Sequence, residues 1–331
     1  MAVYTTIDDP SAYFQTAIYT GNGGTLNVVN DGNSDLQPDW LWFKSRSHTT
    51  DHGIQDSVRG NSLALQSNTN GAEASVGTSQ ITAIGSDGFS LASGGDVNTN
   101  TRTYVCWQWK ETADAGFDIV TYTGNGSNRT ISHSLSAVPH MMIVKNRDED
   151  EEWTVYHGAN TAAPATDYLS LNSTAATADS NTRWNDTAPT SSVFTVGTSD
   201  VVNKNGVAYI AYLFSEKQGY SKFGNYTGNA NADGTFVYTG FKPAWVMVKK
   251  SSATNNWVIQ DTKRNPHNMM TEFLMANVSD AESTGLNFDF LSNGFKLRSN
   301  SGGSNSASDF AYLAFAGEPL VTSTGIPSTA R

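Results

Sequence analysis

Two aspartates in this chain are each followed, three positions later, by an arginine. Asp56 precedes Arg59, and Asp261 precedes Arg264 in a similar context. Hydrolysis of a glycosidic bond requires two carboxylates that face each other across a cleft, and these two acids are the candidates for such a pair. A carboxylate beside an arginine is more simply a structural ion pair. We therefore predict that both aspartates are structural and that the chain is not an enzyme.

The six histidines do not form a catalytic or metal-binding pattern. His157 lies at the position that the two aspartates occupy in related stretches of sequence. A catalytic base would keep its residue type at such positions, so we predict a structural polar contact. His48 and His52 are four residues apart on a strand-and-turn segment, without the Cys or Glu neighbours of a zinc site. We predict no catalytic residue, no metal ligand and no cofactor.

Two acidic segments are candidates for cation binding. Asp31, Asn33 and Asp35 have the alternating oxygen spacing of calcium loops, but the twelfth position is Trp42 instead of a glutamate, which excludes an EF-hand. The acidic run Asp148–Glu152 lies between two predicted strands. Like charges repel each other and stay solvated, so we predict a hairpin tip there. Cation binding by this run is the alternative.

Aromatic side chains on the surface could stack on sugar rings. The candidates for contact with a glycan or a partner are Trp42, Trp107 and Trp184. Side chains alternate between the two faces of a strand, so Trp40 and Trp42 share one face. Only one face is expected to point to the core, and core packing is the competing prediction for these residues.

The sequence Tyr-Thr-Gly-Asn occurs three times, beginning at Tyr19, Tyr122 and Tyr226. The steps are 122 − 19 = 103 and 226 − 122 = 104 residues. Other features recur in the same order, including a proline followed by a lysine, a turn followed by an apolar pair, and a terminal apolar strand. A fixed-period repeat determines how the rest of the chain is interpreted. A unit of about 100 residues has the size of an independent domain, so we predict three tandem domains or closely packed lobes.

The predicted fold is all-β. Short runs of β-branched and aromatic residues alternate with Gly, Asn, Asp and Ser. Turn signals come roughly every 8–12 residues, which indicates a sandwich or barrel. Residues 269–276 are the best candidate for a short helical turn. We predict three β-sandwich repeats of jelly-roll or lectin-like type. They comprise residues 1–114 with an N-terminal arm, residues 115–218, and residues 219–331 with an extended C-terminal tail.

Composition excludes several classes of partner. The chain carries 20 basic and 31 acidic residues, and the three units have net charges of −7 (5 basic, 12 acidic), −5 (6 and 11) and +1 (9 and 8). A nucleic-acid binder needs a basic field to neutralise phosphates, so we predict no nucleic-acid partner. The longest apolar run, residues 207–214, is too short to span a bilayer, which predicts no membrane insertion.

Cysteine usage and the N-terminus bear on where the chain folds. Cys106 is the only cysteine and lies in an apolar strand, so no internal disulfide forms and we predict a small buried hydrophobe. The first residues lack the basic region and apolar core of a signal peptide. We predict folding in a reducing cytoplasm.

Two stretches of the sequence resemble a family of marine bacteriophage virion proteins. They are Thr-Ile-Asp-Asp-Pro at residues 6–10 and Tyr-Thr-Gly-Phe-Lys-Pro-Ala-Trp at residues 238–245. The family is common in phages of ocean cyanobacteria and SAR11-like bacteria, and the resemblance covers almost the whole chain. It implies a phage structural protein with lectin-like, concanavalin-like β-sandwich domains. It supplies no catalytic residues.

These observations predict a non-enzymatic virion component that is made in the bacterial host cytoplasm. We expect a surface-exposed, tail-associated protein of the tail-fibre or adhesin type. Its expected partners are other virion proteins, further copies of itself in a symmetric oligomer, and host surface glycans. Two alternatives remain open: a capsid decoration protein, such as a cement or head-fibre protein, and a polysaccharide depolymerase.

Overall fold

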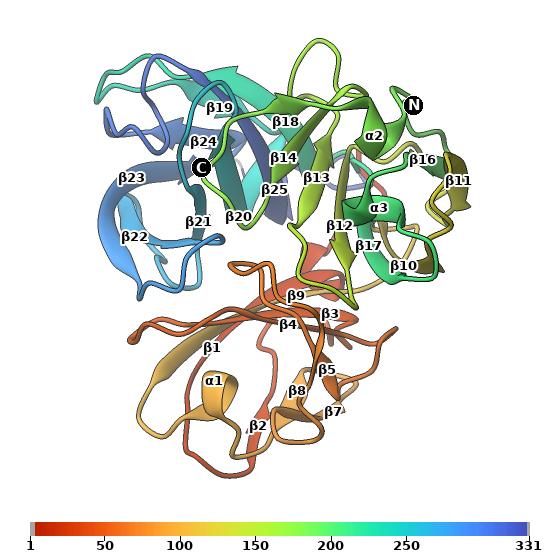
Figure 1. The fold of residues 1–331 in the computed structure, drawn as a ribbon. Coiled ribbons are helices and arrows are strands. Elements are labelled where there is room, and N and C mark those ends of the chain that lie inside the picture. Colours follow the sequence, from red (N-terminus) through yellow and green to blue (C-terminus); the bar gives the residue numbers. More distant parts are fainter. Residues whose placement is uncertain (1–3, 330–331) are drawn as a thin grey trace.

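The computed structural model describes residues 4–329, and within them almost all regular structure is β. Every strand pair is antiparallel. The all-β prediction is confirmed. Figure 1 shows the N-terminal part, in red to orange, packed against the two later parts. We describe residues 4–114, 115–218 and 219–329 as the first, second and third segments.

The first segment contains a four-stranded sheet in the order β1-β9-β3-β4 and two smaller sheets, β2-β8-β7 and β5-β6. A single 3-10 turn precedes the first strand, and one helical turn precedes the last. The elements are η1 (Pro10–Ala12), β1 (Phe14–Thr20), β2 (Leu26–Val28), β3 (Trp40–Ser45), β4 (Gly53–Asp56), β5 (Leu63–Ala64), β6 (Ala74–Ser75), β7 (Ile81–Ile84), β8 (Phe89–Leu91), α1 (Gly95–Asn98) and β9 (Thr103–Trp109).

The second segment contains a six-stranded sheet in the order β10-β17-β12-β13-β14-β15 and a two-stranded sheet, β11-β16. Two helical turns lie near its end. The elements are β10 (Phe117–Thr123), β11 (Arg129–Ser132), β12 (Met141–Asn146), β13 (Thr154–His157), β14 (Asp167–Ser170), β15 (Ala178–Asp179), α2 (Asn181–Trp184), β16 (Val193–Val196), α3 (Asp200–Asn203) and β17 (Ala208–Phe214).

The third segment contains one eight-stranded sheet in the order β18-β25-β20-β21-β22-β23-β24-β19. Residues 269–276, predicted as a helical turn, instead include β22, so that prediction was wrong. Pairing with β21 and β23 satisfies the backbone of this stretch, and such tertiary context overrides a weak local preference. The elements are β18 (Ser221–Thr227), β19 (Phe236–Tyr238), β20 (Phe241–Lys250), β21 (Trp257–Asp261), β22 (Met270–Met275), β23 (Ser283–Leu291), β24 (Gly294–Leu297) and β25 (Asp309–Pro319).

The three segments pair their main strands in the same order. The first long strand pairs with the last one, which pairs with a middle strand, and a further strand follows: β1-β9-β3-β4, β10-β17-β12-β13 and β18-β25-β20-β21. The tyrosine of the repeated tetrapeptide lies opposite an aromatic residue each time and stacks on it, with ring centroids 5.1–5.3 Å apart. These pairs are Tyr19–Tyr104, Tyr122–Tyr209 and Tyr226–Phe310.

The central strands of the main sheets are buried on both faces. One hydrophobic cluster contains residues of all three segments, including Trp40, Met141 and Trp245. Three further clusters each lie within one segment. All six residues of β3 and all six of β12 are therefore buried. The expectation that only one alternation set of β3 points to a core was wrong, because Leu41 and Phe43 pack inside the first segment while Trp40 and Trp42 pack between segments.

The repeated tetrapeptide connects the first strand of each segment to a buried asparagine. In the second segment, Asn203 Nδ2 donates to the carbonyl oxygens of Gly197 (2.7 Å) and Ser127 (2.6 Å). Its Oδ1 accepts from the backbone N–H of Asn125, the last residue of the tetrapeptide, at 3.0 Å. The motif is a structural turn, as three identical copies predicted. Asn98 and Asn305 make the corresponding bonds in the other segments.

The glycine of the tetrapeptide is required by a close backbone approach. A Cβ on Gly124 would lie 2.1 Å from the carbonyl oxygen of Lys204, closer than real Cβ contacts allow. The preceding tyrosine, Tyr122, donates from its hydroxyl to the carbonyl oxygen of Val202 at 2.6 Å in the same region. The sequence of the motif thus follows from the packing of two main-chain segments against each other.

Candidate functional site

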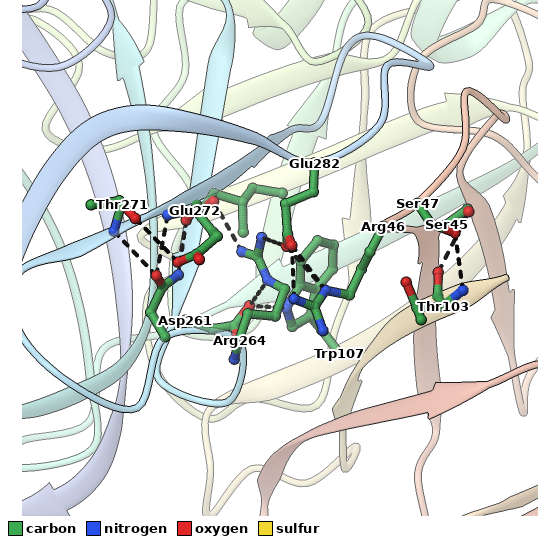
Figure 2. A network of polar contacts seen from close by, with 12 residues as sticks. Ser45, Arg46, Ser47, Thr103, Trp107, Asp261, Arg264, Thr271, Glu272 and Glu282 are labelled. Atoms are coloured by element: carbon green, nitrogen blue, oxygen red, sulfur yellow. Dashed lines mark hydrogen bonds and ion pairs between the residues drawn. The ribbon is translucent and has the colours of Figure 1, made fainter.

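Asp56 and Asp261 lie in buried ion pairs where two segments meet. The distance from Arg59 Nε to Asp56 Oδ2 is 2.6 Å, and Arg264 Nε to Asp261 Oδ2 is also 2.6 Å, with all four side chains fully buried. Each aspartate accepts a further bond from another segment: Tyr212 Oη donates to Asp56 (2.7 Å), and Trp107 Nε1 donates to Asp261 (2.9 Å; Figure 2). The predicted structural ion pairs are confirmed.

A glutamate extends each pair across the contact between segments. Glu282 accepts from Arg264 Nη1 at 2.8 Å and from Arg46 Nη2 of the first segment at 2.7 Å, as Figure 2 shows. Glu73 likewise binds Arg59 at 2.8 Å and Arg147 of the second segment at 2.8 Å. We call each Asp-Arg-Glu-Arg set a latch. The first latch is Asp56, Arg59, Glu73 and Arg147, and the second is Asp261, Arg264, Glu282 and Arg46.

The charges within each latch compensate one another. Burial on its own would lower the pKa of the Arg264 guanidinium, but the charges of Asp261 and Glu282 outweigh it and raise that pKa. Burial on its own would raise the pKa of the Glu73 carboxyl, and its bonds to two arginines lower the pKa instead. Opposite charges thus offset the cost of burial within each latch, which is the chemistry of a structural contact.

The segments contact one another in a closed cycle. The backbone N–H of Glu73 donates to the carbonyl of Arg147 (2.7 Å), which joins the first and second segments. The backbone N–H of Glu282 donates to the carbonyl of Arg46 (2.8 Å), which joins the third segment to the first. The ring N–H of Trp153 in the second segment donates to the carbonyl of Gln66 in the first at 2.9 Å. Trp257 and Ser170 make the corresponding bond between the third and second segments at 3.0 Å.

Two of three buried lysines reinforce these contacts. Lys145 Nζ donates to the carbonyl of Asn70 in the first segment at 3.0 Å, and Lys249 Nζ donates to that of Thr174 in the second at 2.9 Å. Lys44 occupies the same place in the first segment and donates to the carbonyl of Ser45 at 2.9 Å. Burial lowers the pKa of each of the three ammonium groups to about 8. Lys145 and Lys249 therefore join neighbouring segments, whereas the bond of Lys44 stays within the first segment.

The contact between the second and third segments has neutral residues at the latch positions. His157 stands where the aspartates stand (157 − 56 = 101; 261 − 157 = 104), and Asn160 stands where the arginines stand. Thr177 replaces the glutamate and Ser251 the second arginine. The backbone bond is kept, because Thr177 N donates to the carbonyl of Ser251 at 2.9 Å. Thr177 Oγ1 donates to Asn160 Oδ1 at 2.8 Å.

The residue facing His157 explains why an aspartate is absent. Tyr212 and Trp107, the donors to the two aspartates, lie in the last main strands of their segments, and Leu313 is their counterpart in β25. The Leu313 side chain has no hydrogen-bond donor, so a buried carboxylate at position 157 would lack this partner. The His157 ring bonds the Tyr312 carbonyl through Nε2 instead, at 3.0 Å. The predicted structural polar contact of His157 is confirmed, and burial lowers its pKa to about 4.

A cleft of about 790 Å³ lies beside these neutral residues. The arginines and glutamates that fill the corresponding space at the other two contacts are replaced there by shorter side chains. Six of the polar residues that line the cleft carry neutral side chains: Asn160, Thr161, Thr177, Asn225, Ser251 and Ser252.

The charged residues that line the cleft are acidic, and Asn160 adds an amide donor. Asp167, Asp179 and Asp309 line the cleft, and among residues 4–329 no lysine, arginine or histidine does. Asn160 is only 6% exposed, and its Oδ1 is occupied by Thr177. Its Nδ2 has no hydrogen-bond acceptor among residues 4–329 and is accessible to solvent. Within the same residues no group of three His, Cys, Asp or Glu side chains is placed to hold a metal ion.

The model of a family described as a domain of unknown function, DUF7483, matches residues 9–319. The chain belongs to this family. A search of curated proteins finds no match. The DUF7483 match begins before η1 and ends with the last residue of β25, so it includes every helix and strand of the three segments, both latches and the cleft. The DUF7483 domain is therefore the whole cycle of segments and not a single repeat of it.

The three tryptophans predicted to contact a glycan or partner are buried, so this prediction was wrong. Trp42, Trp107 and Trp184 are at most 1% exposed. Their ring nitrogens donate within the protein, for example from Trp42 Nε1 to His52 Nδ1 at 2.8 Å. A sugar ring has no access to these faces. The apolar Leu41 and Phe43 beside Trp42 were the signal that both faces of β3 are covered.

The acidic segments are engaged by neighbouring residues. In the run Asp148–Glu152, Glu149 pairs with Lys204 (2.6 Å), Glu152 pairs with Arg183, and Asp150 accepts from the backbone of Ala72 in the first segment at 2.9 Å. The run connects the antiparallel strands β12 and β13, so the predicted hairpin tip is confirmed, but its side chains are paired and not only solvated. Asp31 likewise pairs with Lys263 of the third segment. The donors come from distant parts of the chain and were invisible to local sequence patterns.

Two further expectations concern Cys106 and membranes. Cys106 is fully buried, as predicted for a small hydrophobe, and burial raises the pKa of its thiol. Among the residues that the structure describes, no helix has the length and apolar character needed to cross a membrane.

Sequence reasoning missed the cleft residues because it examined motifs that are present and not positions where a motif is lost. Asn160, Thr177 and Ser251 carry no signal by themselves. Alignment of the three segments on Pro38, Pro139 and Pro243 would have placed Asn160 against two arginines (59 − 38 = 160 − 139 = 264 − 243 = 21), and these arginines belong to the two latches.

Proposed function

We propose that the protein is a non-enzymatic structural component of a bacteriophage particle, exposed on the surface and associated with the tail, where it contacts host glycans. The observation that carries this proposal is the closed cycle of three segments around a shared aromatic core. Such a core favours a component that holds its shape. The resemblance to marine phage virion proteins supports the same function.

We also propose that each segment is a copy of one lectin-like, jelly-roll β-sandwich unit. The common order of the main strands and the corresponding clasp of Asn98, Asn203 and Asn305 support this interpretation. Three such units in a cycle give one chain a pseudo-threefold arrangement. A single copy could then occupy a threefold or sixfold position on a particle, and several copies could form a symmetric oligomer.

The test is to count copies of the protein in purified particles of the phage that encodes it, by quantitative mass spectrometry, and to locate them by immunogold electron microscopy. We expect about a dozen copies or fewer per particle, because tail appendages are cyclic assemblies of few subunits. The immunogold label should lie at the tail. Several hundred copies over the head would instead establish the decoration protein. Absence from purified particles would refute a structural role.

A further inference from the structure

We propose that the cleft between the second and third segments binds a saccharide that carries hydroxyl groups and no acidic substituent. This inference rests on the proposed function and assigns a site to its glycan contact. It starts from the asymmetry of the three contacts, because two are closed by latches and the third, with Asn160, Thr177 and Ser251, is open.

The dimensions of the cleft suit a small ligand. Its volume of about 790 Å³ lies within the range of small-molecule sites, which is about 300–1,000 Å³. Part of its lining belongs to the second segment, through Thr161 and Asp179, and part to the third, through Asn225 and Ser252. All four of these side chains are exposed, so a ligand can enter from solvent.

The polar groups match the hydrogen-bonding capacity of a sugar. The Asp179 side chain accepts no hydrogen bond from residues 4–329, and Asp309 uses one carboxylate oxygen for Thr227 and leaves the other free. Carboxylates accept from hydroxyl groups, and these charge-assisted bonds are stronger than neutral ones. Asn160 Nδ2 is a solvent-accessible donor with no acceptor among residues 4–329, and a sugar oxygen would accept from it in place of water.

The apolar and electrostatic character of the cleft narrows the ligand further. The methyl groups of Ala162, Ala176 and Ala178 line it and can pack against the C–H face of a sugar ring. The three aspartates, with no lysine, arginine or histidine beside them in the described part of the chain, repel an anion. Uronic and sialic acids are therefore disfavoured, whereas neutral and amino sugars are accepted.

The experiment is an NMR titration of the 15N-labelled full chain. The probes are cellotetraose, mannotetraose and chitotetraose as neutral oligosaccharides, and tetragalacturonate as the acidic counterpart. We expect at least one neutral probe to shift the Asn160 side-chain amide and the backbone amides of residues 160–162, 176–179 and 251–252. Tetragalacturonate should leave them unchanged. No shift with any neutral probe up to about 10 mM, or equal shifts with the acidic one, would overturn the proposal.

A latch grafted into the third contact provides the decisive variant. Thr177→Glu with Ser251→Arg places the residue types of the other two contacts into the cleft and should weaken saccharide binding about tenfold or more. Thr130→Arg adds an arginine at an exposed position of β11, outside the cleft, and should bind normally. Asn160→Ala removes the free donor without adding bulk and should also weaken binding, which keeps the test valid if the graft does not fold. Normal binding by a folded graft would contradict the proposal.

This outcome is separate from the particle measurement. Particles that contain the protein, together with a blank titration, would refute the saccharide site and leave the structural role intact. Saccharide binding by a protein that is absent from particles would refute the structural role alone.

Discussion

Asp261→Asn tests whether the latches hold the segments together. The Asp261 side chain is fully buried and accepts from Arg264 N (2.9 Å), Arg264 Nε (2.6 Å) and Trp107 Nε1 (2.9 Å). An asparagine would keep one acceptor oxygen and direct an NH₂ group at the remaining donors. Breaking a buried pair costs about 3–5 kcal/mol because one charge loses its compensation. Glu282 still neutralises Arg264 at 2.8 Å, so we expect the lower end, about 3 kcal/mol.

The assay is equilibrium unfolding in urea, followed by tryptophan fluorescence and by circular dichroism. Asp289→Asn is the matched control, because Asp289 pairs with Arg298 at 3.2 Å on the surface, where both side chains are partly exposed. An exposed pair contributes about 0–1 kcal/mol. In a double variant, Arg264→Gln added to Asp261→Asn should cost less than the sum of the two single changes, since the residues are directly coupled. Equal stability of Asp261→Asn and Asp289→Asn would refute the role of the latch.

Three further predictions concern local packing and buried groups. Gly124→Ala should lower the free energy of unfolding in the same urea assay by about 2 kcal/mol or more, because the added Cβ would lie 2.1 Å from a carbonyl oxygen. Gly95→Ala is the control and should be neutral, because a Cβ there meets no described atom within 4 Å. Burial lowers the pKa of His52 to about 3 and that of His157 to about 4, below the ordinary 6.5. The stability that depends on their neutral form is therefore fully present above pH 6.5 and is lost as the pH falls toward 4. Their imidazole NMR signals should stay constant from about pH 8 to about pH 5, and midpoints near 6.5 would contradict this. Cys106 should react with a thiol reagent only after unfolding, and rapid labelling of the native protein would show that its strand is accessible.

The sequence predicts those features that depend on local patterns. The β class follows from β-branched and aromatic runs, and the role of Tyr-Thr-Gly-Asn follows from its three identical copies. The Asp56 and Asp261 ion pairs follow from an arginine three residues later. These interactions form between residues close in the chain, or between positions repeated at a fixed interval.

The remaining features depend on how the segments pack, which no local pattern contains. Trp42 and Trp107 face a core that exists only when three segments surround it, so one buried face per strand was the wrong expectation. Glu282 finds Arg46 across 236 residues of chain. The stretch around Met270 becomes a strand because its neighbours in the sheet bond its backbone.

The neutral composition of the third contact follows from the cost of buried charge. Leu313 offers no donor to the position of His157, so an aspartate there would lose a hydrogen bond that the other two possess. A buried arginine without that aspartate would in turn lack its nearest counter-charge, and an uncompensated buried charge costs several kcal/mol. The four positions are thus coupled, and a change at one favours neutral residues at all of them. Asn160 and its neighbours satisfy the contact with short side chains, and the space left by the missing arginines is the cleft.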